Sequence, residues 1–323
     1  MVKKAELHVH LEGTIAPELA HKLAVRNHVS LPEGLIAPSG DRYAFDNFLH
    51  FLNVYDTLAN LIRTPQDYYD LTLDYLIRNA ADDVIYIEMM YSPEHAEKVS
   101  GIPSADHGVA IEQAIRDAEA QHGIVGRILI TGVRHFGPEA VIHIAQQALK
   151  HPSPYITGFG LGGDEAGFPP KLFERAYHIA RDAGLGCTAH AGEFAGVKSM
   201  EDALRYLSVQ RIGHGVQAIH SPEMMALLKE RGIALEVCPS SNVCLGLYSN
   251  LAEHPFPKLL DAGILVSLNS DDPPFFGTTV AQEYARVQDA YDYSDAQMLD
   301  ITRMALDAAF IDETTRANLL ARC

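Results

Sequence analysis

The chain has 323 residues, 47% of them hydrophobic, and a formal net charge of −17. The acidic excess argues against nucleic acid or an anionic membrane as a partner, because binding phosphate groups requires clustered Lys and Arg. Four cysteines without CxxC spacing do not make a disulfide framework, and no segment resembles a signal peptide or a membrane span. We therefore expect a cytoplasmic protein with one domain over residues 1–323.

Short apolar runs of strand length alternate with amphipathic segments along the whole chain. This alternation is typical of repeated βα units with a parallel sheet. The expected strands are residues 6–10, 84–90, 127–133, 155–161, 186–190, 211–215, 234–239 and 265–271. The expected helices are residues 17–26, 65–79, 109–121, 138–149, 170–183, 222–231 and 256–262.

Eight such units predict an α/β fold, the closed (β/α)8 or TIM barrel. The stretch from 31 to 77 is expected to hold more than one helix, as an insertion after the first strand. Its apolar stripe either lines the barrel mouth or packs a helix onto the barrel. The tail from 280 to 323 predicts two or three further helices outside the barrel. The stripe comprises Phe45, Phe48, Phe51, Leu52 and Tyr55.

Polar residues gather where the expected strands end, which is where barrel enzymes hold their active sites. His8 and His10 lie two residues apart on the first strand, so both imidazoles face the same way. His190 ends the fifth strand and Asp271 ends the eighth. Imidazole and carboxylate groups are the ligands of catalytic zinc, which keeps one position for water. We therefore expect these four residues to hold one zinc ion.

Further polar residues at the same strand ends suggest catalytic roles. Glu193, three residues after His190, is a natural general acid/base. His214 lies between two glycines and could either bind the metal or hold the attacking hydroxide. Asp272 must point away from the metal if Asp271 faces it, which suits a substrate contact. Barrel hydrolases with two metals commonly have a bridging group, often a modified lysine, near the end of the fourth strand. This chain has Gly162-Gly163-Asp164 there, so a single ion is favoured.

Five motifs in this order make the chain resemble the adenosine deaminase family nearly from end to end. The resemblance implies a mononuclear zinc barrel that hydrolytically replaces the amine at C6 of adenine with oxygen. The motifs are His8-Val9-His10-Leu11-Glu12-Gly13, His190-Ala191-Gly192-Glu193, Gly213-His214-Gly215, Cys238-Pro239-Ser240-Ser241-Asn242 and Ser270-Asp271-Asp272-Pro273.

The resemblance also implies a role for each site residue. Zinc would be held by His8, His10, His190 and Asp271. Glu193 would protonate ring N1 as hydroxide adds to C6, and would later help ammonia leave. His214 and Asp271 would orient the hydroxide, Asp272 would contact N7, and the backbone N–H of Gly163 would meet N3.

Two features of the sequence indicate different substrates. Glu12, which the resemblance implies is a substrate-binding residue, occupies a position where nucleoside deaminases usually have an aspartate that contacts ribose, whereas adenine deaminases often have glutamate. The segment 162–165 is instead similar to the nucleoside enzymes, and the segments 136–139 and 272–276 resemble a bacterial branch usually labelled adenosine deaminase. The expected reaction is therefore the conversion of adenosine or deoxyadenosine to inosine or deoxyinosine, in purine salvage. Adenine or an N6-substituted purine is the alternative substrate.

Functions of other classes are less well supported by the sequence. A barrel that only binds a ligand would have lost a metal ligand or the acid/base, and here all are present. The second class of zinc deaminases uses H-x-E with P-C-x-x-C, and His95-Ala96-Glu97 lacks that partner motif. A phosphoesterase would need Arg or Lys near the strand ends.

Overall fold

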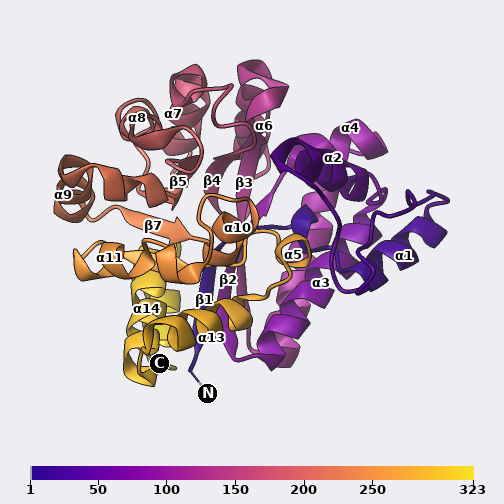
Figure 1. Ribbon diagram of the computed structural model, residues 1–323. Coiled ribbons are helices and arrows are strands. Elements are labelled where there is room, and N and C mark those ends of the chain that lie inside the picture. The colour runs from indigo at the N-terminus through magenta and orange to yellow at the C-terminus, as the bar shows by residue number, and fades with distance from the viewer. Residues whose placement is uncertain (1) are drawn as a thin grey trace.

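The computed structural model describes residues 2–323, apart from the side chain of Val99. Eight parallel strands pair in sequence order, with helices around them (Figure 1). The sheet closes just beyond its last strand, where Asp271 bridges to Val9 and the N–H of His10 donates to the carbonyl of Asp271 at 3.0 Å. The predicted (β/α)8 barrel is therefore confirmed. The strands are β1 (Lys4–His10), β2 (Val84–Tyr91), β3 (Val125–Val133), β4 (Ile156–Gly162), β5 (Gly186–Ala191), β6 (Arg211–His214), β7 (Ala234–Val237) and β8 (Val266–Leu268).

The later strands are shorter than predicted, and the difference lies at the ends that carry polar residues. β8 stops three residues before Asp271, although the apolar run predicted a strand up to that residue. Asp271 has φ 64° and His214, at the end of β6, has φ 59°. Left-handed backbone of this kind is costly for a residue with a side chain, and such strain is concentrated at functional sites.

Helices follow the strands on the outside of the barrel, and several begin with proline in the first turn. The predicted bounds of α1 and α9 match the structure, whereas the segment 170–183 divides into a 3₁₀ turn and α7. The helices are α1 (Pro17–Arg26), α2 (Phe48–Ala59), α3 (Pro65–Ala81), α4 (Pro93–Ser100), α5 (Ser104–His122), α6 (Pro138–Lys150), α7 (Glu174–Asp182), α8 (Gly196–Asp202), α9 (Pro222–Arg231), α10 (Pro239–Cys244), α11 (Phe256–Asp261), α12 (Pro273–Phe276), α13 (Val280–Tyr291), α14 (Asp295–Ala308) and α15 (Glu313–Leu320).

The insertion after β1 places helix α2 over the carboxyl ends of the strands. Phe51 of α2 is buried, with its ring 5.2 Å from that of Phe275 and 5.4 Å from that of Phe276. Tyr55, one turn further along α2, lines the pocket at the barrel mouth. The apolar stripe therefore does both things expected of it, because it packs the helix down and also lines the mouth.

The C-terminal helices lie near the N-terminus, and α14 packs against β8 and β1 (Figure 1). Phe310, just after α14, lies against the guanidinium of Arg211 at 3.7 Å and against Gly186 at the start of β5. A Cβ added to Gly186 would approach the Phe310 ring to 2.3 Å, so glycine makes room for this contact. None of the helices in the described part of the chain could cross a membrane. All eight strands form one sheet, and the single domain over residues 1–323 stays a prediction.

Candidate metal centre and active site

Four side chains from three strand ends direct their ligand atoms at one point. Nε2 of His190 lies 3.1 Å from Nε2 of His8 and 3.2 Å from Nε2 of His10. Oδ1 of Asp271 lies 3.5 Å and 3.4 Å from the same two nitrogens. Ligands about 2.0–2.1 Å from a zinc ion in a tetrahedron are separated by about 3.3 Å. The cluster therefore fits a zinc ion at its centre.

The two buried ligand histidines are held in the tautomer that metal binding requires. Nδ1 of His8 lies 2.8 Å from the carboxylate of Glu236, and Nδ1 of His190 lies 2.9 Å from the carbonyl of Leu161. Both acceptors take the hydrogen on Nδ1 and leave the Nε2 lone pair facing the centre. Glu236 is held in turn by Nε of Arg211 at 2.7 Å.

Two carboxylates make this centre favourable for positive charge. Burial alone would lower the pKa of His8, yet hydrogen bonds to Asp271 and Glu236 raise the pKa of His8 to about 10. Asp271 also accepts a hydrogen bond from the hydroxyl of Ser241 at 2.7 Å, which fixes its other oxygen. A metal cation would supply the same positive charge between these groups.

Glu193 lies beside the cluster in a loop that another carboxylate organises. The backbone N–H groups of Gly192, Glu193, Phe194 and Ala195 all donate to the buried side chain of Glu165, at 2.6 to 3.2 Å. Burial raises the pKa of Glu193 well above its usual value, and the negative charges of Asp271 and Glu165 raise it further. The surroundings of Glu193 therefore favour its protonated form, as a general acid requires.

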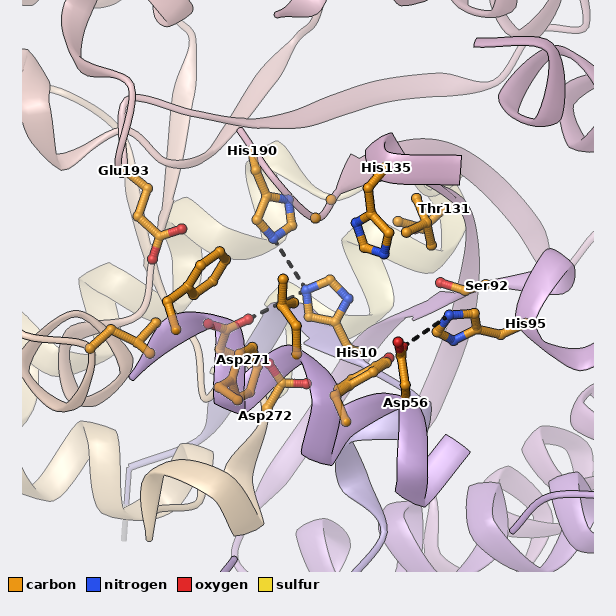
Figure 2. Close-up of a pocket in the computed structure, with 18 of the residues that line it drawn as sticks. His10, Asp56, Ser92, His95, Thr131, His135, His190, Glu193, Asp271 and Asp272 are labelled. Atoms are coloured by element: carbon orange, nitrogen blue, oxygen red, sulfur yellow. Dashed lines mark hydrogen bonds and ion pairs between the residues drawn. The ribbon is translucent and has the colours of Figure 1, made fainter. Parts of the chain in front are cut away.

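The pocket above the cluster contains most of the predicted site residues. Figure 2 shows Glu193 on one side of the cluster and Ser92, His95 and Asp56 on the other. The pocket encloses about 80 Å³ of solvent-accessible space. Its walls include the following predicted residues: His10, Gly163, His190, Glu193, His214, Asp271 and Asp272.

Asp272 and Gly163 are both placed to contact a ligand. Oδ1 of Asp272 is buried and has no hydrogen-bond partner within the described residues. Burial, and then the charge of Asp271, raise the pKa of Asp272 well above its usual value, so the group can donate a hydrogen. Gly163 has φ 91°, and a Cβ there would meet Nδ1 of His135 at 3.0 Å.

The carboxylate of Glu12 lies in a buried cluster beside the pocket. Glu12 is not among the described residues that line the pocket, and its contact with the substrate stays a prediction. It accepts hydrogen bonds from Tyr68 at 3.0 Å, from the N–H of Ser92 at 3.2 Å and from Tyr55 at 3.4 Å. Of these three partners, Tyr55 and Ser92 line the pocket. Glu12 therefore contacts the pocket wall through Tyr55 and Ser92.

Four buried residues with a part in the site were given no role from the sequence. Three of them hydrogen-bond to predicted residues, and His254 hydrogen-bonds to Asn242, in each case between distant segments. The signals that could have indicated them are the motif that contains Asn242 and the position of Glu236 on an expected strand. The four are Glu165, Glu236, Asn242 and His254.

Comparison with known proteins agrees with this geometry. Residues 3–323 match a family model described as adenosine deaminase. A protein of Sinorhizobium medicae named adenine deaminase is 44% identical over 320 residues, 99% of this chain and 98% of that protein. The crystal structure of an adenine deaminase from Arthrobacter aurescens has a TM-score of 0.93 at 32% identity, over 99% of this chain and 98% of the other. A zinc-bound amidohydrolase from Burkholderia ambifaria has a TM-score of 0.89 at 29% identity, over 99% and 89%.

Proposed function

The chain belongs to the adenosine deaminase family and is a hydrolytic deaminase, and we propose that its substrate is the free base adenine. The sequence favoured adenosine or deoxyadenosine, with adenine as the alternative. Relatives that share 44% of the sequence over nearly their whole length are named adenine deaminase, which supports the alternative.

The observation that carries the proposal is the wall of side chains opposite Glu193. If N1 of the purine faces Glu193, the five-membered ring with N9 points across the pocket toward Asp56 and His95 (Figure 2). Oδ1 of Asp56 on α2 lies 3.3 Å from Nε2 of His95 on α4. Beside them, the hydroxyl of Tyr55 donates to the carboxylate of Glu12. A ribose on N9 would have to displace this wall, whereas adenine carries only a hydrogen there.

We propose further that one zinc ion per chain is bound by His8, His10, His190 and Asp271. The fit rests on the separations of their ligand atoms and on the acceptors that fix His8 and His190. Zinc bound in such a site lowers the pKa of water so that a nucleophile is available near neutral pH.

The protein's own residues supply the remaining chemistry. Glu193 gives its proton to N1, which makes C6 more electrophilic. Its carboxylate then takes the hydrogen of the hydroxyl group added at C6 and passes it to the amine, so that ammonia leaves and the C6 carbonyl forms. Asp272, protonated, donates to the N7 lone pair, and the N–H of Gly163 donates to N3. His214 holds the attacking oxygen beside C6. These contacts orient the base so that its amine lies over the metal cluster.

The proposal is tested by assaying the zinc-loaded protein with adenine, adenosine and deoxyadenosine in parallel, following ammonia release. We expect hypoxanthine from adenine and a kcat/KM for either nucleoside lower by about 10²-fold or more, the scale of discrimination that a pocket of fixed shape provides. A higher kcat/KM for adenosine than for adenine would show that the nucleoside is the substrate. No activity on any of the three would refute the proposed deamination.

A further inference from the structure

A chain of hydrogen bonds runs from the backbone of α11 to the active site. The N–H of Phe256 donates to Nδ1 of His254 at 3.2 Å, and Nε2 of His254 lies 3.2 Å from Oδ1 of Asn242. Nδ2 of Asn242 lies 3.2 Å from Nδ1 of His214 and 3.3 Å from Oε1 of Glu193. We call Phe256, His254 and Asn242 the relay. The side chains of His254 and Asn242 are buried.

The direction of every hydrogen bond in the relay follows from the backbone at its outer end. A backbone N–H can only donate, so Nδ1 of His254 must accept. Burial lowers the pKa of His254 to about 3, so the ring is neutral and carries its hydrogen on Nε2. That hydrogen requires an acceptor, which is the oxygen of the Asn242 amide. The NH₂ group of Asn242 therefore faces His214 and Glu193, although an isolated amide could be turned either way.

This orientation decides which nitrogen of His214 carries a hydrogen. Because Asn242 donates to Nδ1, the hydrogen of the neutral His214 ring lies on Nε2. A nitrogen that carries a hydrogen has no lone pair for a metal, so His214 is not a ligand even though it lies near the ligand atoms of His8, His190 and Asp271. Its Nε2–H can instead donate to an oxygen at the cluster.

We propose that Asn242 and His254 are positioning residues that hold His214 as its Nε2–H tautomer, ready to donate to the attacking water. The inference rests on the proposed deamination, since it assigns the role of His214 in that reaction. The opposite tautomer would have a lone pair on Nε2, so it could only accept a hydrogen from the water and could not donate one to the attacking oxygen.

Asn242 also distinguishes the two oxygens of Glu193. Its second N–H donates to Oε1, so the carboxyl proton that Glu193 holds belongs on Oε2. Oε2 is then the oxygen that can give a proton to ring N1. The amide of Asn242 thus orients both the carboxyl group of Glu193 and the ring of His214.

The first test is the tautomer itself, read from imidazole ¹⁵N shifts of the zinc-loaded protein labelled with ¹⁵N-histidine. His214→Asn and His254→Gln identify the two resonance pairs by their loss. We expect both rings to carry hydrogen on Nε2, whereas the ligands His8 and His190 carry it on Nδ1. A hydrogen on Nδ1 of His214 would overturn the proposal, and this result does not depend on which purine is the substrate.

The second test uses a matched pair of variants at His254, which touches neither substrate nor metal ligands. His254→Gln keeps an acceptor for Phe256 and a donor for Asn242, whereas His254→Phe has similar bulk and neither group. We expect zinc content and KM to stay near wild type in both variants. We expect kcat to fall about 10- to 100-fold in His254→Phe, and by less than about 3-fold in His254→Gln, because one oriented donor is lost only in the former.

The outcomes separate this inference from the proposed function. If wild type deaminates no purine, the proposed function fails while the ¹⁵N shifts still decide the tautomer. Equal kcat values for wild type and His254→Phe would overturn the catalytic role of the relay. Equal losses in both variants would show that His254 acts by packing alone, which also contradicts the proposal.

Discussion

The hydroxyl of Tyr55 donates to the carboxylate of Glu12 at 3.4 Å, which links the first strand's end to the helix over the pocket. Tyr68 and the N–H of Ser92 hold the same carboxylate at 3.0 and 3.2 Å. Glu12 therefore acts as a buried anchor for one wall of the pocket.

Shortening this anchor is expected to widen the substrate range. In Glu12→Asp the carboxylate loses one methylene and cannot reach Tyr55, Tyr68 and Ser92 together. We expect the ratio of kcat/KM for adenosine to that for adenine to rise by about 10-fold or more, on the scale of a lost pocket contact. Glu12→Gln, which keeps the length, is the control and should keep the preference. An unchanged ratio in Glu12→Asp would show that Tyr55 does not set the specificity.

Removal of a metal ligand is expected to abolish zinc binding. Asp271→Ala deletes the carboxylate that lies 3.4 to 3.5 Å from two ligand nitrogens, so zinc content per chain should fall well below one. The matched control is Ser241→Ala, which removes only the hydrogen bond to Asp271 and should keep most of the metal. Unchanged zinc in Asp271→Ala, measured by elemental analysis, would contradict the ligand assignment.

Replacing the general acid is expected to separate chemistry from metal binding. Glu193→Gln keeps the size and the hydrogen bond from Asn242 but cannot give up a proton, so kcat should fall by about 10²-fold or more. Zinc content and thermal stability should stay near wild type, because Glu193 is not one of the four proposed ligands. A near-normal kcat in Glu193→Gln would show that Glu193 takes no part in the proton transfer.

The pH dependence should follow the raised pKa of Glu193. The protonated form is the active one, so kcat/KM should fall as the pH rises through that pKa. In Glu165→Gln one negative charge that raises the pKa is gone, and the alkaline limb should move to lower pH. The same change weakens the hold on the 192–195 loop, so kcat should also fall. An alkaline limb that moves to higher pH would contradict the assignment.

Most of the barrel could be predicted because strands and longer helices leave a regular pattern in the sequence. The bounds of α1 and α9 match, but α10 and α12, with six and four residues, are too short to show helical periodicity. The gathering of His8, His10, His190 and Asp271 could be predicted because strand ends of a barrel converge on one axis. The contact of Asn242 with Glu193 could not, since it spans 49 positions of sequence.

The contact beneath the barrel gives a prediction about stability. Gly186→Ala would place a methyl group 2.3 Å from the Phe310 ring, and this overpacking should lower the free energy of unfolding by about 1–3 kcal/mol. Combining it with Phe310→Ala should cost less than the sum of the two changes, because the clash is then gone. Additive losses in urea unfolding would show that the two residues do not constrain each other.

The most direct test of the account is a competition assay with equal concentrations of adenine and adenosine. The zinc-loaded protein acts on both in one tube, and hypoxanthine and inosine are separated by chromatography. Their initial rates give the ratio of the two kcat/KM values without separate calibration. The account predicts hypoxanthine as the main product, in excess of about 10²-fold. Inosine as the main product would contradict it.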